Sequence, residues 1–112
     1  MDAKMLAFLI LTGVGLLYIG LSVLLIMRKI PPNPICGVRV PKTMNNLDIW
    51  YKANAYCGWT FLYAGIVTII ANVAFAFVPG LNVETYTNYC LSVSLAGVMI
   101  SAILTLIYLR SL

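Results

Sequence analysis

The chain has 112 residues, of which 62% are hydrophobic and 9% are charged, and it contains no histidine. Soluble domains are about 45–50% apolar and about 25% charged, so this composition excludes an ordinary water-soluble domain. Without histidine, and with three acidic residues in all, the chain offers no paired-carboxylate site, nucleophile–base pair or metal cluster. We therefore predict a small membrane protein that is not an enzyme and uses no metal or cofactor.

The first apolar segment, residues 5–27, contains no charged residue and is long enough to cross a membrane. A signal peptide is the alternative interpretation, because the segment is N-terminal and follows Lys4. Its apolar core is too long for a signal peptide, and no small-residue cleavage site follows it. The helix is expected to end before Pro31 and Pro32, which are unable to continue it. We expect a retained transmembrane helix.

Residues 30–55 are predicted to form a structured loop and then an interfacial helix that leads into the second span. Gly37 permits backbone angles that are closed to other residues, and Pro41 fixes φ, so the loop is expected to have a defined shape. Asn45 or Asn46 is suited to cap the interfacial helix.

Two further apolar segments follow, at residues 56–78 and 90–109, and they end at Pro79 and Arg110. These unbroken segments lack the alternation that a transmembrane β-barrel needs. We predict an all-α integral membrane protein, a single domain over residues 1–112 with three transmembrane helices.

Small and polar residues recur on one face of each of the last two spans. They are Thr60, Ala64, Thr68, Asn72 and Ala76 in the second span and Ser94, Gly97, Ser101 and Thr105 in the third. Such residues let helices approach closely and form hydrogen bonds across the contact. Thr68, Asn72, Gly97 and Ser101 are therefore predicted packing residues, and a place for Asn72 in a substrate path is the alternative. No Asp, Glu, Lys or Arg falls inside a span, which disfavours an ion-coupled transporter.

Loop charge predicts the orientation. The basic residues between the first two spans are Arg28, Lys29, Arg39, Lys42 and Lys52, whereas the next loop contains only Glu84. The positive-inside rule then places the N-terminus outside and the C-terminus in the cytoplasm of a multi-pass protein of the cell membrane. This topology accounts for the net charge of +4, so we expect no nucleic-acid partner.

The three cysteines, Cys36, Cys57 and Cys90, have no metal-binding spacing. Cys36 and Cys57 are expected near the cytoplasmic face and Cys90 near the outer face. We expect free thiols that pack as small apolar residues.

The segment from Asn33 to Gly58 resembles the signature of the SdpI/YfhL family of bacterial and archaeal membrane proteins. That signature reads approximately N-x-x-x-G-[IV]-R-x-P-x-T, then six residues, then W-x-x-x-[NH]-x-x-x-G. It is carried here by Asn33, Gly37, Val38, Arg39, Pro41, Thr43, Trp50, Asn54 and Gly58. The family takes its name from an immunity protein that protects a toxin-producing Bacillus from its own secreted killing peptide. The resemblance implies a membrane location, a shaped loop and a role in immunity or envelope protection.

Arg39 is the candidate for ligand binding, because its guanidinium suits a phosphate, a peptide carboxylate or an acidic group of a partner. The alternatives are that it contacts lipid headgroups or caps carbonyls of its own loop. Asn33, Thr43 and Asn54 either complete a polar pocket around Arg39 or satisfy backbone groups of the loop. Trp50 is expected to be an interfacial anchor. With Gly37 and Pro41, these residues form the predicted binding set.

The partners expected from these features are anionic lipid headgroups, a toxin peptide or a membrane protein, and further copies of the chain. The leading functional hypothesis is an immunity or envelope-protection factor that recognises a peptide, lipid or partner through its cytoplasmic loop. The alternative is a structural accessory subunit of a larger membrane complex, and a small oligomeric transporter is the least favoured.

Overall fold

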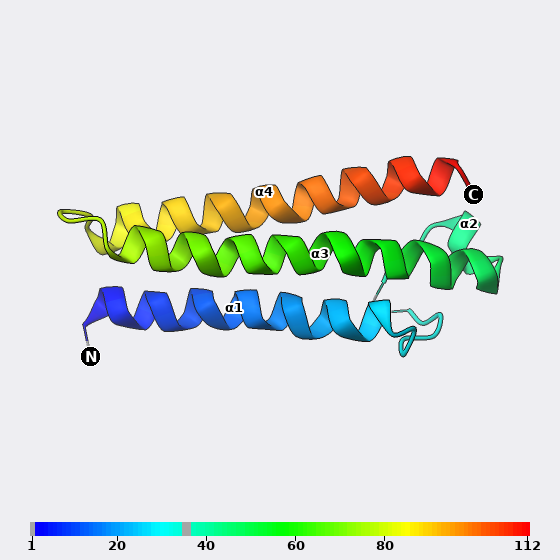
Figure 1. The fold of residues 1–112 in the computed structure, drawn as a ribbon, viewed down its shortest axis with the longest axis horizontal. Coiled ribbons are helices and arrows are strands. Elements are labelled where there is room, and N and C mark those ends of the chain that lie inside the picture. The colour runs from blue at the N-terminus through cyan, green and yellow to red at the C-terminus, as the bar shows by residue number, and fades with distance from the viewer. Residues whose placement is uncertain (1, 35–36) are drawn as a thin grey trace.

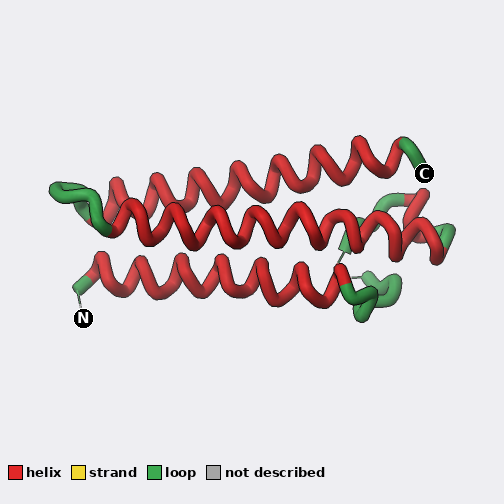
Figure 2. The backbone as a smooth tube through the Cα atoms, in the orientation of Figure 1, coloured by secondary structure: helices red, strands yellow, loops and turns green. Residues whose placement is uncertain are grey.

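The computed structural model describes residues 2–34 and 37–112, and it consists of three long helices and one short helix (Figure 1). The helices are α1 (Ala3–Ile26), α2 (Pro41–Met44), α3 (Leu47–Ala76) and α4 (Val83–Arg110). The described residues outside these helices form loops and turns (Figure 2). The predicted all-α class is therefore confirmed. The short helix α2, in the loop between the first two long helices, was not predicted as a separate element.

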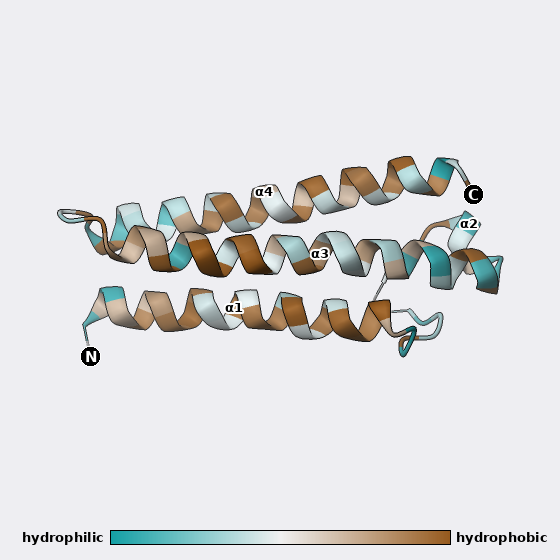
Figure 3. Cartoon of the chain, in the orientation of Figure 1, coloured by the Kyte–Doolittle hydropathy of each residue, from teal (hydrophilic) through white to brown (hydrophobic). Residues whose placement is uncertain are grey.

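Each long helix is long and apolar enough to cross a membrane. Even α1, with 24 residues, extends about 36 Å at about 1.5 Å per residue, which exceeds a hydrocarbon core of about 30 Å. Hydrophobic residues occupy most of the length of the three helices, and hydrophilic residues gather toward the ends of the bundle (Figure 3). These features are those of a multi-pass membrane protein.

The bundle is built around α3, which packs antiparallel against both α1 and α4, whereas α1 and α4 have little contact with each other (Figure 1). The loop between α1 and α3 and the C-terminal end of α4 lie at the same end of the bundle. Every Lys and Arg except Lys4 belongs to that end, which is termed the basic end below. Lys4 and the loop between α3 and α4 lie at the opposite end.

A polar side chain caps the start of each long helix. Asp2 accepts a hydrogen bond from the Met5 amide at 2.8 Å, and Asn82 does the same for α4. Asn46, one of the two predicted caps, accepts from the Ile49 amide at 3.2 Å. From this cap α3 continues without a break to Ala76, so the predicted interfacial helix forms the first turns of the second long helix. A side-chain cap of this kind stabilises a helix by about 1 kcal/mol.

The end of α1 is closed by a left-handed residue. Arg28 has φ 59°, and its amide donates to the Leu25 carbonyl at 3.1 Å while the Lys29 amide donates to Leu24 at 3.0 Å. These two bonds satisfy the last carbonyls of the helix, and glycine is the usual residue at the turning position. An arginine there costs about 1–2 kcal/mol of backbone strain.

Glycines bring α1 and α3 into close contact. A Cβ on Gly58 would lie 2.8 Å from the Ser22 carbonyl oxygen, and one on Gly65 would lie 3.1 Å from the Gly15 carbonyl oxygen. Small residues allow this approach, and within lipid such packing replaces the hydrophobic effect as the force that joins helices. Sequence reasoning missed the role of Gly65, although its spacing of seven residues from Gly58 was a readable signal.

Two of the predicted packing residues, Gly97 and Ser101, lie at the contact between α3 and α4. The hydroxyl groups of Thr60 and Ser101 are hydrogen-bonded at 2.6 Å, and a Cβ on Gly97 would lie 3.0 Å from that of Ala64. Tyr86 of α4 is fully buried and donates its hydroxyl to the backbone carbonyl of Asn72 at 3.0 Å. Polar groups therefore join the two helices along much of their length.

Three buried polar side chains in the bundle have no hydrogen-bond partner among the described residues. Asn72 is 0% exposed and Thr68 is 2% exposed, and both lie on the face of α3 that packs inside the bundle. The third is Thr12 of α1, whose hydroxyl oxygen is also buried. A polar group without a partner is costly inside a membrane, so these three side chains are expected to lower the stability of the bundle.

Candidate functional site

The loop at the basic end is attached to α3 by Asn54. Asn54 is 2% exposed, and its Oδ1 accepts a hydrogen bond from the Val38 amide at 2.7 Å. Its Nδ2 donates to the Trp50 carbonyl one turn earlier at 2.9 Å. The carboxamide thus uses both its acceptor and its donor, one on the loop and one on its own helix, which fixes the loop in register with α3.

The indole of Trp50 lies beneath this loop. Trp50 is 0% exposed, and its Nε1 donates to the Ile30 carbonyl at 2.9 Å. The prediction that Trp50 is an interfacial anchor is therefore wrong, because its ring is covered by protein. The reason is tertiary: the loop that follows α1 folds back over the first turns of α3, and the sequence pattern alone did not show that return.

Gly37 makes this return possible. Its φ is +103°, a value that side chains disfavour, and a Cβ there would lie 2.8 Å from Asn54 Oδ1 and 2.9 Å from Trp50 Cη2. The position therefore requires glycine for its backbone angle and also for the space that Asn54 and Trp50 occupy. The prediction of a shaped loop at Gly37 is in accord with this geometry.

Thr43 closes the second half of the loop. It is 0% exposed, and its hydroxyl oxygen accepts from the Val40 amide at 3.1 Å and lies 2.7 Å from the Val38 carbonyl, to which it donates. Pro41 is the first residue of α2, where the missing amide hydrogen costs nothing because the helix has no partner for it. Thr43 thus satisfies backbone groups on both sides of residue 39.

The loop is also joined to α4. Lys42 donates from Nζ to the Leu109 carbonyl at 2.9 Å, which caps the last turn of that helix. Next to Leu109 in the sequence is Tyr108, whose ring stacks on that of Tyr56. The ring centroids are 4.3 Å apart, and the contact joins α3 to α4. Sequence reasoning did not assign either contact, because each joins residues that are more than fifty positions apart.

Arg39 differs from the other predicted site residues. It is exposed, and its guanidinium makes no hydrogen bond or ion pair with any residue that the structure describes. Asn33 donates to the Pro31 carbonyl at 2.7 Å, and Thr43 and Asn54 are bonded to loop or helix backbone. Of the two alternatives for these three polar residues, the described contacts therefore match backbone satisfaction. They hold the loop that presents Arg39.

The acidic and basic groups of this end are unevenly balanced. Asp48 pairs with Lys52 at 3.0 Å, and both side chains are largely exposed, so the pair adds little stability. Among residues 2–34 and 37–112 this is the sole ion pair. The remaining cations of the basic end, Arg39 included, have no acidic side chain beside them in that part of the chain.

The profile of the SdpI/YfhL protein family matches residues 29–109, which is well over half of the chain. The chain belongs to the SdpI/YfhL family. No curated protein and no solved structure gives a match.

The SdpI/YfhL match covers the loop, α2, α3 and nearly all of α4, and it begins three residues after the end of α1. Within the matched region, the contacts of Gly37, Thr43, Trp50 and Asn54 explain why the loop has its shape. Gly58 contacts a helix outside the matched region, because the absence of a Cβ leaves room for the Ser22 carbonyl of α1.

A hollow accompanies the site. A cavity of about 170 Å³ lies beneath the loop, and its lining residues are Leu21, Leu25, Gly37, Val38, Cys57 and Phe61. Cys57 thus lies on the loop side of the bundle, whereas Cys90 is buried among residues of the other half and Cys36 lies outside the described residues. The cavity is apolar apart from its backbone groups, and it leaves space under the loop segment that precedes Arg39.

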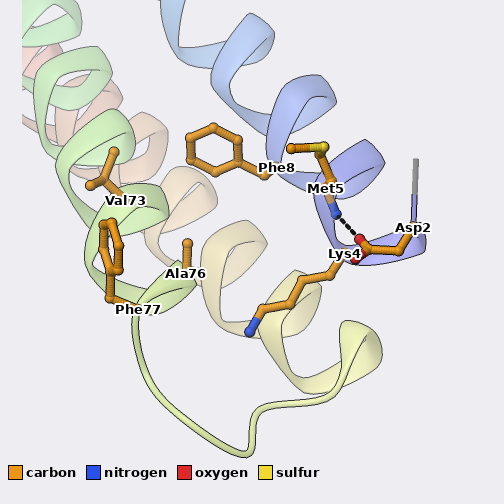
Figure 4. Close-up of a pocket in the computed structure, with 7 residues that line it drawn as sticks. All are labelled: Asp2, Lys4, Met5, Phe8, Val73, Ala76 and Phe77. Carbon is orange, nitrogen blue, oxygen red and sulfur yellow. Dashed lines mark hydrogen bonds between the residues drawn. The ribbon is translucent and has the colours of Figure 1, made fainter.

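A larger pocket, of about 430 Å³, lies at the opposite end of the bundle between α1 and α3 (Figure 4). Its lining residues are Asp2, Lys4, Met5, Phe8, Val73, Ala76 and Phe77. Lys4 reaches across to the Leu81 carbonyl at 3.4 Å and lies 5.6 Å from the centre of the Tyr86 ring. The pocket contains none of the predicted site residues, so we place the candidate site at the basic end.

Proposed function

We propose that this SdpI/YfhL protein is a non-enzymatic recognition factor of the cell membrane that acts in immunity or envelope protection. Its basic end faces the cytoplasm, in accord with the positive-inside rule. Its ligand is an anionic group of a peptide or partner protein, and Arg39 is the residue that binds it.

The observation that supports this proposal is the contrast between Arg39 and the residues around it. The backbone on one side of Arg39 is held by Asn54, and on the other side by Thr43. A loop that is already ordered loses little conformational entropy when it binds, so a guanidinium held on it is suited to recognition. The planar donors of arginine match a carboxylate in two parallel hydrogen bonds.

The immunity part of the proposal is tested by survival. Cells of a sensitive Bacillus that express the chain are challenged with the secreted killing peptide against which the name-giving member of the family protects. We expect protection by the unaltered chain, its loss in Arg39→Gln and partial retention in Arg39→Lys. Lys29→Gln is the matched control, because it removes one positive charge from the same end without touching the loop contacts of Asn54 or Thr43.

Membrane content of each variant is measured with a C-terminal fluorescent fusion, so that loss of protein is separated from loss of binding. Full protection by an Arg39→Gln variant present at the normal level would refute the role of Arg39. An unaltered chain that gives no protection would refute immunity to that peptide.

A second candidate function is that of an accessory subunit in a larger membrane complex. The supporting observation is an open groove of about 230 Å³ on the outer side of α3 and α4. Small residues, Thr60, Ala64, Gly97 and Ser101, lie along it together with larger apolar ones. A helix of another subunit would fit there, because small residues allow close approach within lipid.

Native mass spectrometry of protein extracted gently from its own membrane separates the two candidates. A stoichiometric partner subunit that is lost in Val67→Trp, at an exposed residue of the groove, but kept in Gly13→Leu, would favour the accessory role. Gly13 is the control because a Cβ there meets nothing within 4 Å. A bare monomer or homo-oligomer would count against that role and would favour transient recognition.

A further inference from the structure

A pocket at the basic end lies between α2 and the C-terminal turn of α4. Its volume is about 350 Å³, and its lining residues are Val40, Lys42, Leu106, Leu109 and Arg110. We propose that this pocket binds the phosphate of an anionic phospholipid, with Lys42 and Arg110 as the cationic contacts. The proposal is independent of the proposed function, which rests on Arg39.

Both cations are available to a ligand. Lys42 is exposed, and its ammonium donates one hydrogen bond to the Leu109 carbonyl at 2.9 Å, which leaves two of its three protons free. Arg110 is exposed too, and its guanidinium makes no hydrogen bond or ion pair within the described part of the chain. The bond to Leu109 also fixes where the ammonium group lies, at the wall of the pocket.

No acidic side chain on the described residues neutralises this pair. Asp48, the acidic residue of the basic end, forms an ion pair with Lys52 at 3.0 Å. Asp2 and Glu84 lie at the N-terminal ends of α1 and α4, which are at the far end of the bundle from this pocket. The pocket therefore has a positive charge that an anionic ligand would complement.

The rest of the wall decides between kinds of anion. Val40, Leu106 and Leu109 are aliphatic, and Leu106 is 50% exposed on the last turns of α4. At this level a transmembrane helix leaves the hydrocarbon, and a phospholipid places its phosphate there with the glycerol and acyl chains alongside. A free phosphate would use the cations alone, whereas a phospholipid would also cover the exposed leucine.

The pocket at the opposite end lacks these features. There the single cation, Lys4, already contacts the Leu81 carbonyl and the Tyr86 ring, and Asp2 lies in the same wall. An anion at that end would meet a single cation and, in the same wall, a carboxylate. The two ends of the molecule are therefore expected to differ in lipid preference.

The test is native mass spectrometry of the full chain in detergent, titrated with phosphatidylglycerol or with phosphatidylcholine. We expect one phosphatidylglycerol to bind in clear preference to phosphatidylcholine. Arg110→Gln should weaken its binding about fivefold, which is the usual effect of one interfacial cation, and Arg110→Lys should retain most of it. Lys29→Gln, which removes a cation from the same end outside the pocket, should leave binding unchanged.

Three results would overturn the proposal. Equal weakening by Arg110→Gln and Lys29→Gln would mean that the general charge of the basic end attracts the lipid. Displacement of the lipid by inorganic phosphate at matching concentration would assign the pocket to free phosphate. If Arg110→Gln and a second variant, Lys42→Gln, both bound the lipid as tightly as the unaltered chain, neither cation would be a contact. Because Arg39 is intact in all these variants, failure here leaves the proposed function standing.

Discussion

Replacing Gly37 by alanine tests the central claim about the loop, that its shape depends on one glycine. The new methyl group would force a side chain onto a backbone with φ +103°, which costs about 1–2 kcal/mol. It would also lie 2.8 Å from Asn54 Oδ1, so the Val38–Asn54 hydrogen bond must lengthen or break. Leaving these partly buried groups unpaired costs about 1–3 kcal/mol more. We expect a total loss of about 3 kcal/mol.

Two other glycines supply matched controls. Gly80 also has a positive φ, +82°, but a Cβ there meets nothing within 4 Å, so Gly80→Ala should cost only the backbone part, about 1–2 kcal/mol. Gly13 lies within α1 and has equally open surroundings, so Gly13→Ala should be neutral or stabilising. The predicted order of stability is thus Gly13→Ala, then Gly80→Ala, then Gly37→Ala.

The assay is reversible unfolding in mixed micelles with increasing dodecyl sulfate, followed by tryptophan fluorescence. A Trp59→Phe background leaves Trp50 as the reporter, and its buried indole should shift to longer wavelength when the loop detaches. If Gly37→Ala were as stable as Gly80→Ala, the contacts of Asn54 and Trp50 with the loop would not contribute as described, and the reasoning would fail.

Three further substitutions test other parts of the bundle by the same unfolding assay. Gly58→Ala should lower the stability by about 1–3 kcal/mol, because the new Cβ would lie 2.8 Å from the Ser22 carbonyl oxygen. Gly20→Ala is the control and should cost nothing, since its surroundings are open, and equal stability of the two variants would contradict the close α1–α3 contact. Asn72→Leu should raise the stability by about 1–2 kcal/mol, since the Asn72 carboxamide has no partner among the described residues. A loss of stability would instead show that the carboxamide is hydrogen-bonded in the membrane, for example to buried water. Arg28→Gly should stabilise the end of α1 by about 1 kcal/mol, because φ 59° suits glycine, and an unchanged midpoint would argue against strain at that residue.

The candidate site was only partly readable before its structure was known. The sequence pointed to the loop segment, because Gly37 and Pro41 indicate a shaped backbone and because the spacing of the motif is specific. It left open whether Asn33, Thr43 and Asn54 surround Arg39 or hold the loop. The described hydrogen bonds match the second alternative, and they do so through carbonyls and amides, which carry no sequence signal.

Contacts between distant residues were the least readable. The bond from Lys42 to Leu109 and the close approach of Gly65 to Gly15 depend on how the helices are placed side by side. A lysine in a basic loop suggests contact with lipid in general, and nothing in its neighbours indicates a helix C-terminus far along the chain. The pocket between Lys42 and Arg110 follows from that placement and was not foreseen.

The sequence by itself determined the class of the protein, because its apolar segments are long enough to cross a bilayer as helices. Inside lipid the backbone amides and carbonyls of such a segment find hydrogen-bond partners only within their own helix. Caps such as Asn46 were readable too, since they act on amides only three residues away. The burial of Trp50 and the exposure of Arg39 were decided by the tertiary structure alone. Which side of a loop faces protein and which faces outward depends on the elements it folds against, and those elements lie far from it in the chain.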